Sequence, residues 1–508
     1  MRSFKSVAKG FLDNERTSSG ILTAALIAAV LAFNIVIFAL ANIFTLSFTA
    51  EEPDRFVLTG NTDDLFADAI DAGKKVTINF CFPKKEDLLS HETGFFVHKT
   101  AEEYKARYKD FIEIEYVNLI TGLNSKGENV SERIETWQTN KETDEKNYLA
   151  RGSVVFECGE NYKVVTDTYT SAAFADFYTL DASGSIVSYN GEAFMAAMIN
   201  WVTVDYHPTA YFTAGHSEQL DRAFMTLLIS AGYTVDIVNL KENDVPEDTD
   251  LLIISNPLSD FEKGLGGARK ELERLNDYVK DGGNIYVALD PYVGKLPVLE
   301  GFLAGNGIAF SETDVDGKLI RNIVKDPNNA ITSDGFTLVA DFAQNEIADK
   351  IGSTVSKYSE GSVIVREAAK LELSKSAFPI LISTPSSSLE ADGEQVDGEG
   401  SYPVAACAKI KNDNNKIASL CVVSSVYISV SDALITNGYS NTDFMYSLFD
   451  NFYGQSGMPY GCNVVKYDTY ILENLTMGKA KIYTALILTV PVAIAIAGAA
   501  VVIKRKNR

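Results

Sequence analysis

The sequence predicts an α/β protein in which two α/β domains lie outside the cell between two transmembrane helices. Three observations lead to this prediction. Two long uncharged segments stand near the ends of the 508-residue chain, basic residues flank both of them, and strand-like and helix-like segments alternate in the region between. The length exceeds what one hydrophobic core usually organises, so more than one domain is expected.

The two uncharged segments are residues 21–48 and residues 482–503. A helix needs about 20 apolar residues to cross ~30 Å of hydrocarbon, so each segment is long enough to span a membrane. The first segment has an alternative interpretation, because Ala39-Leu40-Ala41 resembles the cleavage site of a signal peptide. We favour an uncleaved anchor, since the apolar run is longer than a signal-peptide core and continues past this site.

Basic residues in the flanks indicate the orientation, because in short flanks they stay on the cytoplasmic side. We therefore expect residues 1–20 and residues 504–508 to be cytoplasmic, which makes this a two-pass protein of the cell membrane. The basic residues in these flanks are Arg2, Lys5, Lys9, Arg16, Lys504, Arg505, Lys506 and Arg508.

The region between the flanks is strongly acidic. Eight of the 45 basic residues lie in the flanks but only two of the 68 acidic residues do, which leaves a net charge of about −29 between them. Such a surface repels nucleic acid and anionic lipid headgroups, so we expect no nucleic-acid partner.

Residues 54–204 are predicted to form the first α/β domain, either distal or proximal to the membrane. Apolar alternation and β-branched residues predict strands, and one segment has helical character. The strands are expected at 76–82, 112–117, 153–157 and 162–166, and the helix at 101–108. A charged stretch rich in glycine and asparagine, residues 124–147, is predicted to be a long loop.

Residues 207–460 are predicted to form the second α/β domain. Strands are expected at 210–213, 234–239, 251–255 and 284–289, with helices at 219–231 and 268–279. This alternation implies a parallel sheet covered on both faces. Residues 311–375 read as an irregular insertion, after which strands at 402–409 and 416–423 flank a turn and a helix covers 441–453.

Five cysteines, none in a C-x-x-C pair, are too few for a disulfide scaffold. An external location permits a disulfide, and Cys407 with Cys421 across the predicted hairpin is the first candidate. The alternative is that all five are small buried hydrophobic residues. The other three are Cys81, Cys158 and Cys462.

Several segments resemble a known family, and they follow one another in the order of that family. AYFTAGHSEQ at 210–219 resembles the strand and GHGE signature of GldG-like proteins, the auxiliary subunits of gliding-motility-type ABC transporters. Ser217 stands where the family has its second glycine, the residue best suited to a positive φ. Further segments that resemble the family are residues 56–66, 104–119, 228–240, 245–261, 271–291, 296–315 and 425–454.

The resemblance implies that the second domain has a Rossmann-like, glutamine-amidotransferase-like parallel sheet that has lost its nucleophile. The sequence agrees, because Asp290-Pro291 follows the strand where such a fold would offer a cysteine, and the chain has no G-x-S-x-G motif. It also has no Walker motif, so it cannot hydrolyse ATP itself.

The function implied is that of a non-catalytic, membrane-anchored auxiliary subunit of an ABC transport complex. We expect no enzyme activity and no cofactor, with an ABC permease, its ATPase subunit and an unknown extracellular cargo as partners. One alternative is a stand-alone surface binding protein or receptor for a glycan or peptide. Another is a hydrolase whose motif has degenerated.

His216 and Glu218 form the best candidate ligand site, because a helix-terminal N–H group and an imidazole could together hold an anion. Asp290 is a further candidate, since it lies at a strand end, where ligands are usually contacted in α/β sheets. The alternative is that His216 and Glu218 satisfy the loop and cap the following helix. No catalytic residue and no metal site are predicted.

Overall fold

The computed structural model describes residues 57–139, 148–166, 174–180, 184–262, 270–412, 415–436, 438–453 and 457–466. Both predicted transmembrane segments, 21–48 and 482–503, and both predicted cytoplasmic ends lie outside these residues. Among the described residues, no helix is both long and apolar enough to cross a membrane. All of them belong to one compact unit that begins at Phe56.

The first part of the chain forms a five-stranded sheet in the order β3-β2-β1-β4-β5. β1 and β2 are parallel and are joined by two helices, whereas β4 runs antiparallel to β1 and forms a hairpin with β5. The strands are β1 (Val76–Phe80), β2 (Ile112–Asn118), β3 (Leu123–Asn124), β4 (Val154–Cys158) and β5 (Asn161–Val165).

Helices cover both faces of this sheet. Ile78 and Phe80 contribute to the core on one face together with the helices α3, α5 and α7, whereas Val117 and Val155 pack with Trp137 of α6 on the other. The helices are α3 (Thr62–Asp71), α4 (Lys85–Leu89), α5 (Glu92–Arg107), α6 (Ser131–Trp137) and α7 (Gly191–Trp201), with the short strands β6 (Tyr178–Leu180) and β7 (Ile186–Tyr189) before α7.

Two predictions for this part need correction. The helix expected at 101–108 begins at Glu92, and the loop expected at 124–147 contains α6. Aromatic and β-branched residues and Gly94 lower the helix propensity before residue 101, but Val97, Ala101 and Tyr104 share one buried face. In α6 only Ile134 and Trp137 are buried, too few for a clear period.

The second part forms a nine-stranded sheet in the order β17-β16-β19-β22-β23-β11-β10-β8-β9. The four strands β8, β9, β10 and β11 are parallel as predicted, and β23 adds a fifth parallel strand that the sequence analysis does not assign to this sheet. β22, β19, β16 and β17 extend the sheet antiparallel. The strands are β8 (Thr209–Ala214), β9 (Thr234–Asn239), β10 (Thr249–Ser255), β11 (Asn284–Ala288), β16 (Thr337–Phe342), β17 (Val363–Arg366), β19 (Ala377–Ser383), β22 (Pro403–Lys411) and β23 (Ile417–Val423).

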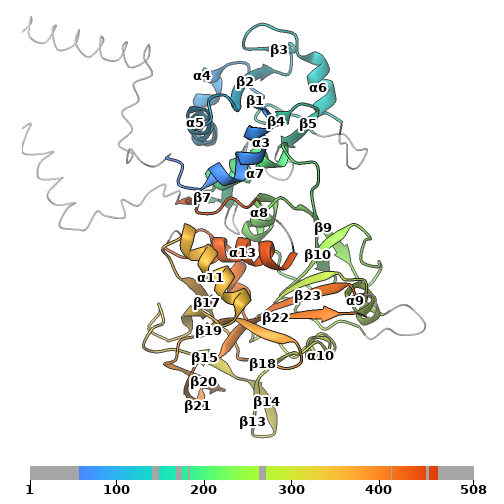
Figure 1. The fold of residues 1–508 in the computed structure, drawn as a ribbon, viewed down its shortest axis with the longest axis vertical. Coiled ribbons are helices and arrows are strands. Elements are labelled where there is room, and N and C mark those ends of the chain that lie inside the picture. The colour runs from blue at the N-terminus through green and yellow to red at the C-terminus, as the bar shows by residue number, and fades with distance from the viewer. Residues whose placement is uncertain are drawn as a thin grey trace, which may run out of the picture. The chain divides into compact units, whose positions relative to one another are not determined.

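This sheet is the middle of three layers (Figure 1). Along β10, Leu251 and Ile253 face one helical layer, whereas Leu252 and Ile254 face the other. These two buried faces explain why residues 251–254 are all apolar. One layer contains α8 (Arg222–Ser230), α11 (Glu346–Tyr358) and α13 (Asn441–Tyr453), and the other contains α9 (Glu271–Lys280) and α10 (Pro297–Gly305).

The prediction of an irregular insertion at 311–375 is wrong. The region contains α11 and several strands, two of which belong to the main sheet. Most of these strands have only three or four residues, which is too short for a clear period, and the partners of β15 and β18 lie more than 60 residues away along the chain. The remaining elements are β12 (Ile308–Phe310), β13 (Glu312–Val315), β14 (Lys318–Arg321), β15 (Ile323–Lys325), β18 (Leu371–Leu373), β20 (Ser387–Ala391), β21 (Glu394–Gly400), α12 (Ser431–Leu434) and β24 (Val465–Lys466).

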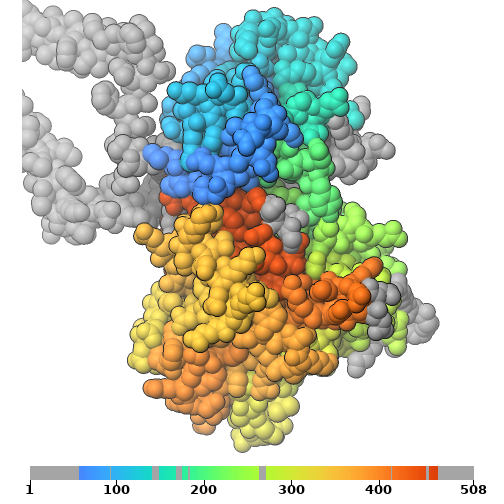
Figure 2. Space-filling view, in the orientation of Figure 1, coloured from blue at the N-terminus to red at the C-terminus, as the bar shows by residue number. Residues whose placement is uncertain are grey.

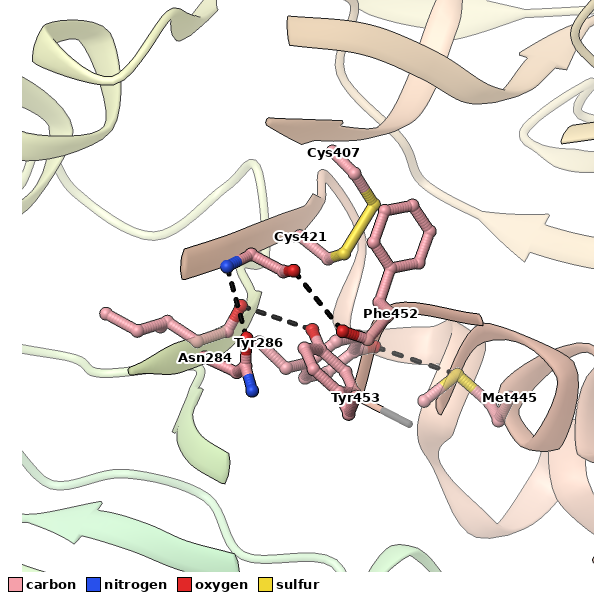
Figure 3. The surroundings of a disulfide bond; sticks show 9 residues. Asn284, Tyr286, Cys407, Cys421, Met445, Phe452 and Tyr453 are labelled. Atoms are coloured by element: carbon pink, nitrogen blue, oxygen red, sulfur yellow. Dashed lines mark hydrogen bonds between the residues drawn. A yellow bond between two sulfur atoms is a disulfide. The ribbon is translucent and has the colours of Figure 1, made fainter. Parts of the chain in front are cut away.

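A disulfide joins Cys407 of β22 to Cys421 of β23, which confirms the predicted pair. The two residues are direct partners in the antiparallel ladder, with their Cα atoms 4.1 Å apart. Phe452 of α13 lies beside the bond (Figure 3), and its carbonyl accepts a hydrogen bond of 3.2 Å from the Ser419 hydroxyl. The bond therefore joins the parallel and antiparallel halves of the sheet beneath α13.

Replacing Cys407 and Cys421 together by alanine is expected to lower the free energy of unfolding by about 3 kcal/mol, because the bond closes a loop in the unfolded chain. The cysteines are 14 residues apart. Urea denaturation of oxidised wild type, reduced wild type and the double variant measures the effect, with Cys158→Ala as the control at a cysteine outside the bond. Equal midpoints for oxidised and reduced wild type would contradict the prediction.

Candidate functional site at the ends of the parallel strands

The topology places a switch point at the carboxyl ends of β8 and β10. The chain goes from β8 to β9 on one side and from β10 to β11 on the other, so it leaves these two neighbouring strands in opposite directions. Such a switch point is where open α/β sheets bind ligands. The segments that follow β8, β10 and β11 at this edge are residues 215–220, 256–261 and 290–292, and we call them the strand-end site.

The backbone of the strand-end site adopts unusual conformations. Ser217 has a φ of 57° and Asn256 a φ of 46°, values that cost L-residues roughly 1–2 kcal/mol. Ser217 therefore occupies a left-handed position, although serine stands where the resemblance suggests glycine. Gly215 has a φ of 110°, and a side chain there would come within 2.7 Å of Asn239 Oδ1. Backbone strain of this kind is frequent at functional sites.

His216 is fully buried between two glutamates. Its Nδ1 lies 2.9 Å from Glu218 Oε1, and its Nε2 lies 3.0 Å from Glu271 Oε1. The ring of Phe261 stacks on the imidazole at 4.1 Å. The His216 carbonyl also accepts hydrogen bonds from the amides of residues 258 and 259. The structure thus brings the two predicted residues His216 and Glu218 together, but in a closed ion network.

The charge state of this network follows from its geometry. Burial alone would lower the pKa of His216, but hydrogen bonds to Glu218 and Glu271 outweigh it and raise the pKa to about 9. Burial acts to raise the pKa of each glutamate, and the hydrogen bond with His216 reverses this, so both pKa values are lowered. An imidazolium between two carboxylates is therefore the stable form at neutral pH.

The loop contacts favour the structural role considered for His216 and Glu218. Glu218 also accepts a hydrogen bond of 2.8 Å from the His216 amide. The following helix is capped by Asp221, whose carboxylate accepts from the amide of Ala223 at 2.8 Å, so this helix begins at Arg222 and not at residue 219 as predicted. Both ring nitrogens of His216 face carboxylates, so neither can activate a hydroxyl group.

Asp290 lies in the neighbouring turn. Its amide donates to Asn256 Oδ1 at 3.1 Å, and its carboxylate accepts from the Tyr292 amide at 2.8 Å. Within the described residues, no hydrogen bond joins the Asp290 carboxylate to His216 or Glu218. Asp290 is therefore connected to the segment 256–261 through Asn256, and it has no contact of this kind with His216.

The two serines that follow β23 at this edge are engaged in hydrogen bonds to backbone carbonyls. Ser424, at the end of β23, donates its hydroxyl to the carbonyls of Ala369 at 2.6 Å and Val404 at 3.0 Å. Ser425 donates to the carbonyl of Arg366. In the part of the chain that the structure describes, no three histidine, cysteine, aspartate or glutamate residues are grouped to hold a metal ion.

Three apolar side chains are exposed at the strand-end site, and no local pattern in the sequence indicates them. Leu220, Leu258 and Tyr292 are 37%, 47% and 58% exposed, one in each segment. Acidic residues lie near Tyr292: burial, and then the negative charges of nearby acids, raise its pKa. These acids are Glu367, Glu390, Asp290 and Asp334. The arrangement can accept an apolar group that carries positive charge.

Residues missed by the sequence analysis hold the site together. Three of them make contacts with the segment after β8 from 37 to 55 positions further along the chain, so nothing in their own segments indicates a role. They are Glu271 and Phe261, which contact His216, and Asn256, which contacts Gln219. Asp260 also belongs to this edge, where its carboxylate accepts from the amides of Val298 and Leu299 and so caps α10. Only the parallel order of the strands places these residues at one edge.

No protein-family model matches the chain, and no curated protein matches it significantly. Solved structures with an α/β fold match about half of it. The N-terminal domain of mmIFT52 is 17% identical over 48% of this chain and 96% of its own, with a TM-score of 0.35. The identity is too low to indicate more than a fold.

Two further solved structures are a ThuA-like protein and a glutamine amidotransferase. The ThuA-like protein from Bacteroides uniformis is 13% identical over 48% of this chain and 93% of its own, with a TM-score of 0.29. The amidotransferase from Thermotoga maritima is 11% identical over 48% of this chain and 98% of its own, with a TM-score of 0.26. At these scores no activity and no site is transferred from them.

The His216 network predicts a pH-dependent stability. Because its pKa is raised above the ordinary value near 6.5, His216 contributes fully below pH 6.5, and the contribution is lost as the pH rises through about 9. At pH 6 the free energy of unfolding should be higher for wild type than for His216→Gln. This difference should fall by roughly 3 kcal/mol between pH 6 and 10. Urea denaturation at each pH measures this difference. The exposed His91→Gln is the control, and a difference independent of pH would contradict the assignment.

Proposed function

We propose that this chain is a membrane-anchored, non-catalytic auxiliary subunit of an ABC transport complex, and that its external α/β region binds a partner or cargo. The observation that supports this most directly is the contrast within the strand-end site. His216 is locked between two glutamates and cannot act as a base, whereas Leu220, Leu258 and Tyr292 are exposed. Such a surface suits binding better than turnover.

The proposal includes the finer assignment to a GldG-like family with a degenerate glutamine-amidotransferase-like domain. It is supported by the order of the resembling segments and by five parallel strands flanked by helices. It is also supported by the turn after β11, where Asp290 and Pro291 offer no nucleophile. No cofactor is required by this function.

The proposed location is the cell membrane, with both termini cytoplasmic and the α/β region outside. The uncharged segments 21–48 and 482–503 and their basic flanks support it. The disulfide between Cys407 and Cys421 gives independent support, because such bonds persist mainly in oxidising compartments.

The proposed partners follow from what the chain lacks. Without a Walker motif it cannot use ATP, so energy-coupled transport requires a separate ATPase and permease. A stand-alone receptor for a glycan or peptide is the second candidate. It is favoured by the exposed aromatic ring of Tyr292 among carboxylates, a combination that also suits a sugar or a basic peptide.

Purification of the tagged protein from its native membrane in mild detergent, followed by mass spectrometry, tests the proposal. We expect an ABC permease and its ATPase in near-stoichiometric amounts. Leu258→Asp is expected to reduce recovery of the external partner or cargo at least tenfold, because a charge replaces an apolar contact at the strand-end site. Ile237→Asp on β9 is the matched control, since Ile237 is also 47% exposed.

The opposite results are equally informative. Recovery of the protein alone, even after crosslinking, would contradict the transporter assignment and favour the receptor. Equal losses in Leu258→Asp and Ile237→Asp would mean that the strand-end site is not the binding surface. Amide or ester hydrolysis that His216→Gln abolishes would favour the degenerate hydrolase.

A further inference from the structure

The first and last described segments of the chain meet at one buried carboxylate. Glu192 is the second residue of α7 and is 8% exposed. Its Oε1 accepts hydrogen bonds from the amides of Thr59 at 2.5 Å and Gly60 at 2.6 Å. Its Oε2 accepts from the Thr59 hydroxyl at 2.9 Å and from the Asn463 amide at 3.2 Å. One side chain thus holds two segments about 400 residues apart in sequence.

The two segments also contact each other directly. The Asn61 amide donates to the Tyr460 carbonyl at 3.1 Å, and the Asn463 amide donates to the Thr59 hydroxyl oxygen at 2.9 Å. Gly60 packs so closely that a Cβ atom there would lie 2.4 Å from Cys462 Sγ. Glycine is therefore required at this position for the segments to approach.

The C-terminal segment is attached to both α/β regions. The Gly461 amide donates to Asp443 Oδ1 of α13 at 3.0 Å. Further along, β24 pairs antiparallel with β7, with Val465 opposite Tyr189. In the space-filling view, red atoms of the C-terminal segment lie beside blue atoms of the N-terminal segment (Figure 2). Residues 460–466 therefore connect the larger sheet to the first part of the chain.

The two carboxylates at this junction are held by neutral donors. Burial raises the pKa of Glu192 and raises the pKa of Asp443 to about 6. Among the described residues, no lysine or arginine forms an ion pair with either carboxylate. β24 has only two residues, so residues 460–466 are joined to β7 by a much shorter ladder than those that join the longer strands of either sheet. Segments with few backbone hydrogen bonds open locally at a smaller cost than whole sheets unfold.

We propose that residues 59–61, Glu192 and residues 460–463 form a latch, which opens by release of residues 460–466 while both sheets stay folded. The latch closes the external region at the two points where the chain enters and leaves it. Its role rests on the proposed function. In a membrane-anchored protein, a displacement of the chain next to the membrane would open the latch and so reach the external region. The latch itself requires only the contacts described above.

Thr59→Val tests the coupling between the two segments. It removes the hydroxyl that contacts Glu192, Gly461 and Asn463, while leaving the amide of residue 59 able to donate. Hydrogen–deuterium exchange in residues 460–466 is expected to accelerate at least tenfold, with β8 and β10 unchanged. Thr121→Val, in an exposed turn, is the control. Unchanged exchange in 460–466, or acceleration throughout the protein, would overturn the latch.

Gly60→Ala tests the closed geometry, because a Cβ atom at residue 60 would lie 2.4 Å from Cys462 Sγ. We expect hydrogen–deuterium exchange in residues 460–466 to accelerate at least tenfold, with β8 and β10 unchanged, because the two segments can no longer approach each other. Gly294→Ala is the control, since the space around Gly294 is open. Exchange in residues 460–466 that stays as slow in Gly60→Ala as in wild type would overturn the proposed closed state.

Both measurements use the isolated full-length chain in detergent and need no transport partner. A protein that purifies without a permease but shows both effects would disprove the proposed function and leave the latch intact. A complex with permease and ATPase whose latch variants show neither effect would do the reverse.

Discussion

The pairing of β23 with β11 is the constraint on which the larger part of the molecule depends. β23 follows β11 by about 130 residues, yet it completes the parallel half of the sheet, and the Ser419 amide donates to Asn284 Oδ1 at 3.1 Å. Its hairpin with β22 also joins the four antiparallel strands, β22, β19, β16 and β17, to the parallel half of the sheet. The disulfide between Cys407 and Cys421 reinforces this point, where an error in register would displace α13 and both cores.

The strand-end site shows how one edge of that sheet separates structural from available groups. The charged residues next to the strands form hydrogen bonds and ion pairs that stabilise the strained turns. His216 is the main example. The groups left at the surface are apolar and aromatic, in acidic surroundings. This division is the reason for our proposal that the strand-end site is a binding surface, and for testing that proposal at Leu258.

The latch at Glu192 likewise depends on a buried carboxylate. Neutral donors from distant segments satisfy this carboxylate and so fix where those segments lie. The strand-end site depends on the order of β8, β10 and β11, whereas the latch depends on α7, α13 and the chain segments at Glu192. Side-chain contacts connect the two, because Asp221 after the strand-end site accepts a hydrogen bond from Ser431 of α12, and α12 contacts α13.

The sequence by itself determined much of the secondary structure. Residues 441–453 form a helix as predicted, the parallel strands stand where apolar runs predict them, and the spacing of the hairpin predicted the Cys407–Cys421 bond. These features are local, since they follow from periodicity within one segment. Tertiary structure decided the rest: the strands within 311–375, the partner Glu271 of His216, and the meeting of Thr59 with Asn463 at Glu192. Each of these joins residues from separate segments, and their pairing is fixed by the order of strands in the sheet, which no local pattern encodes.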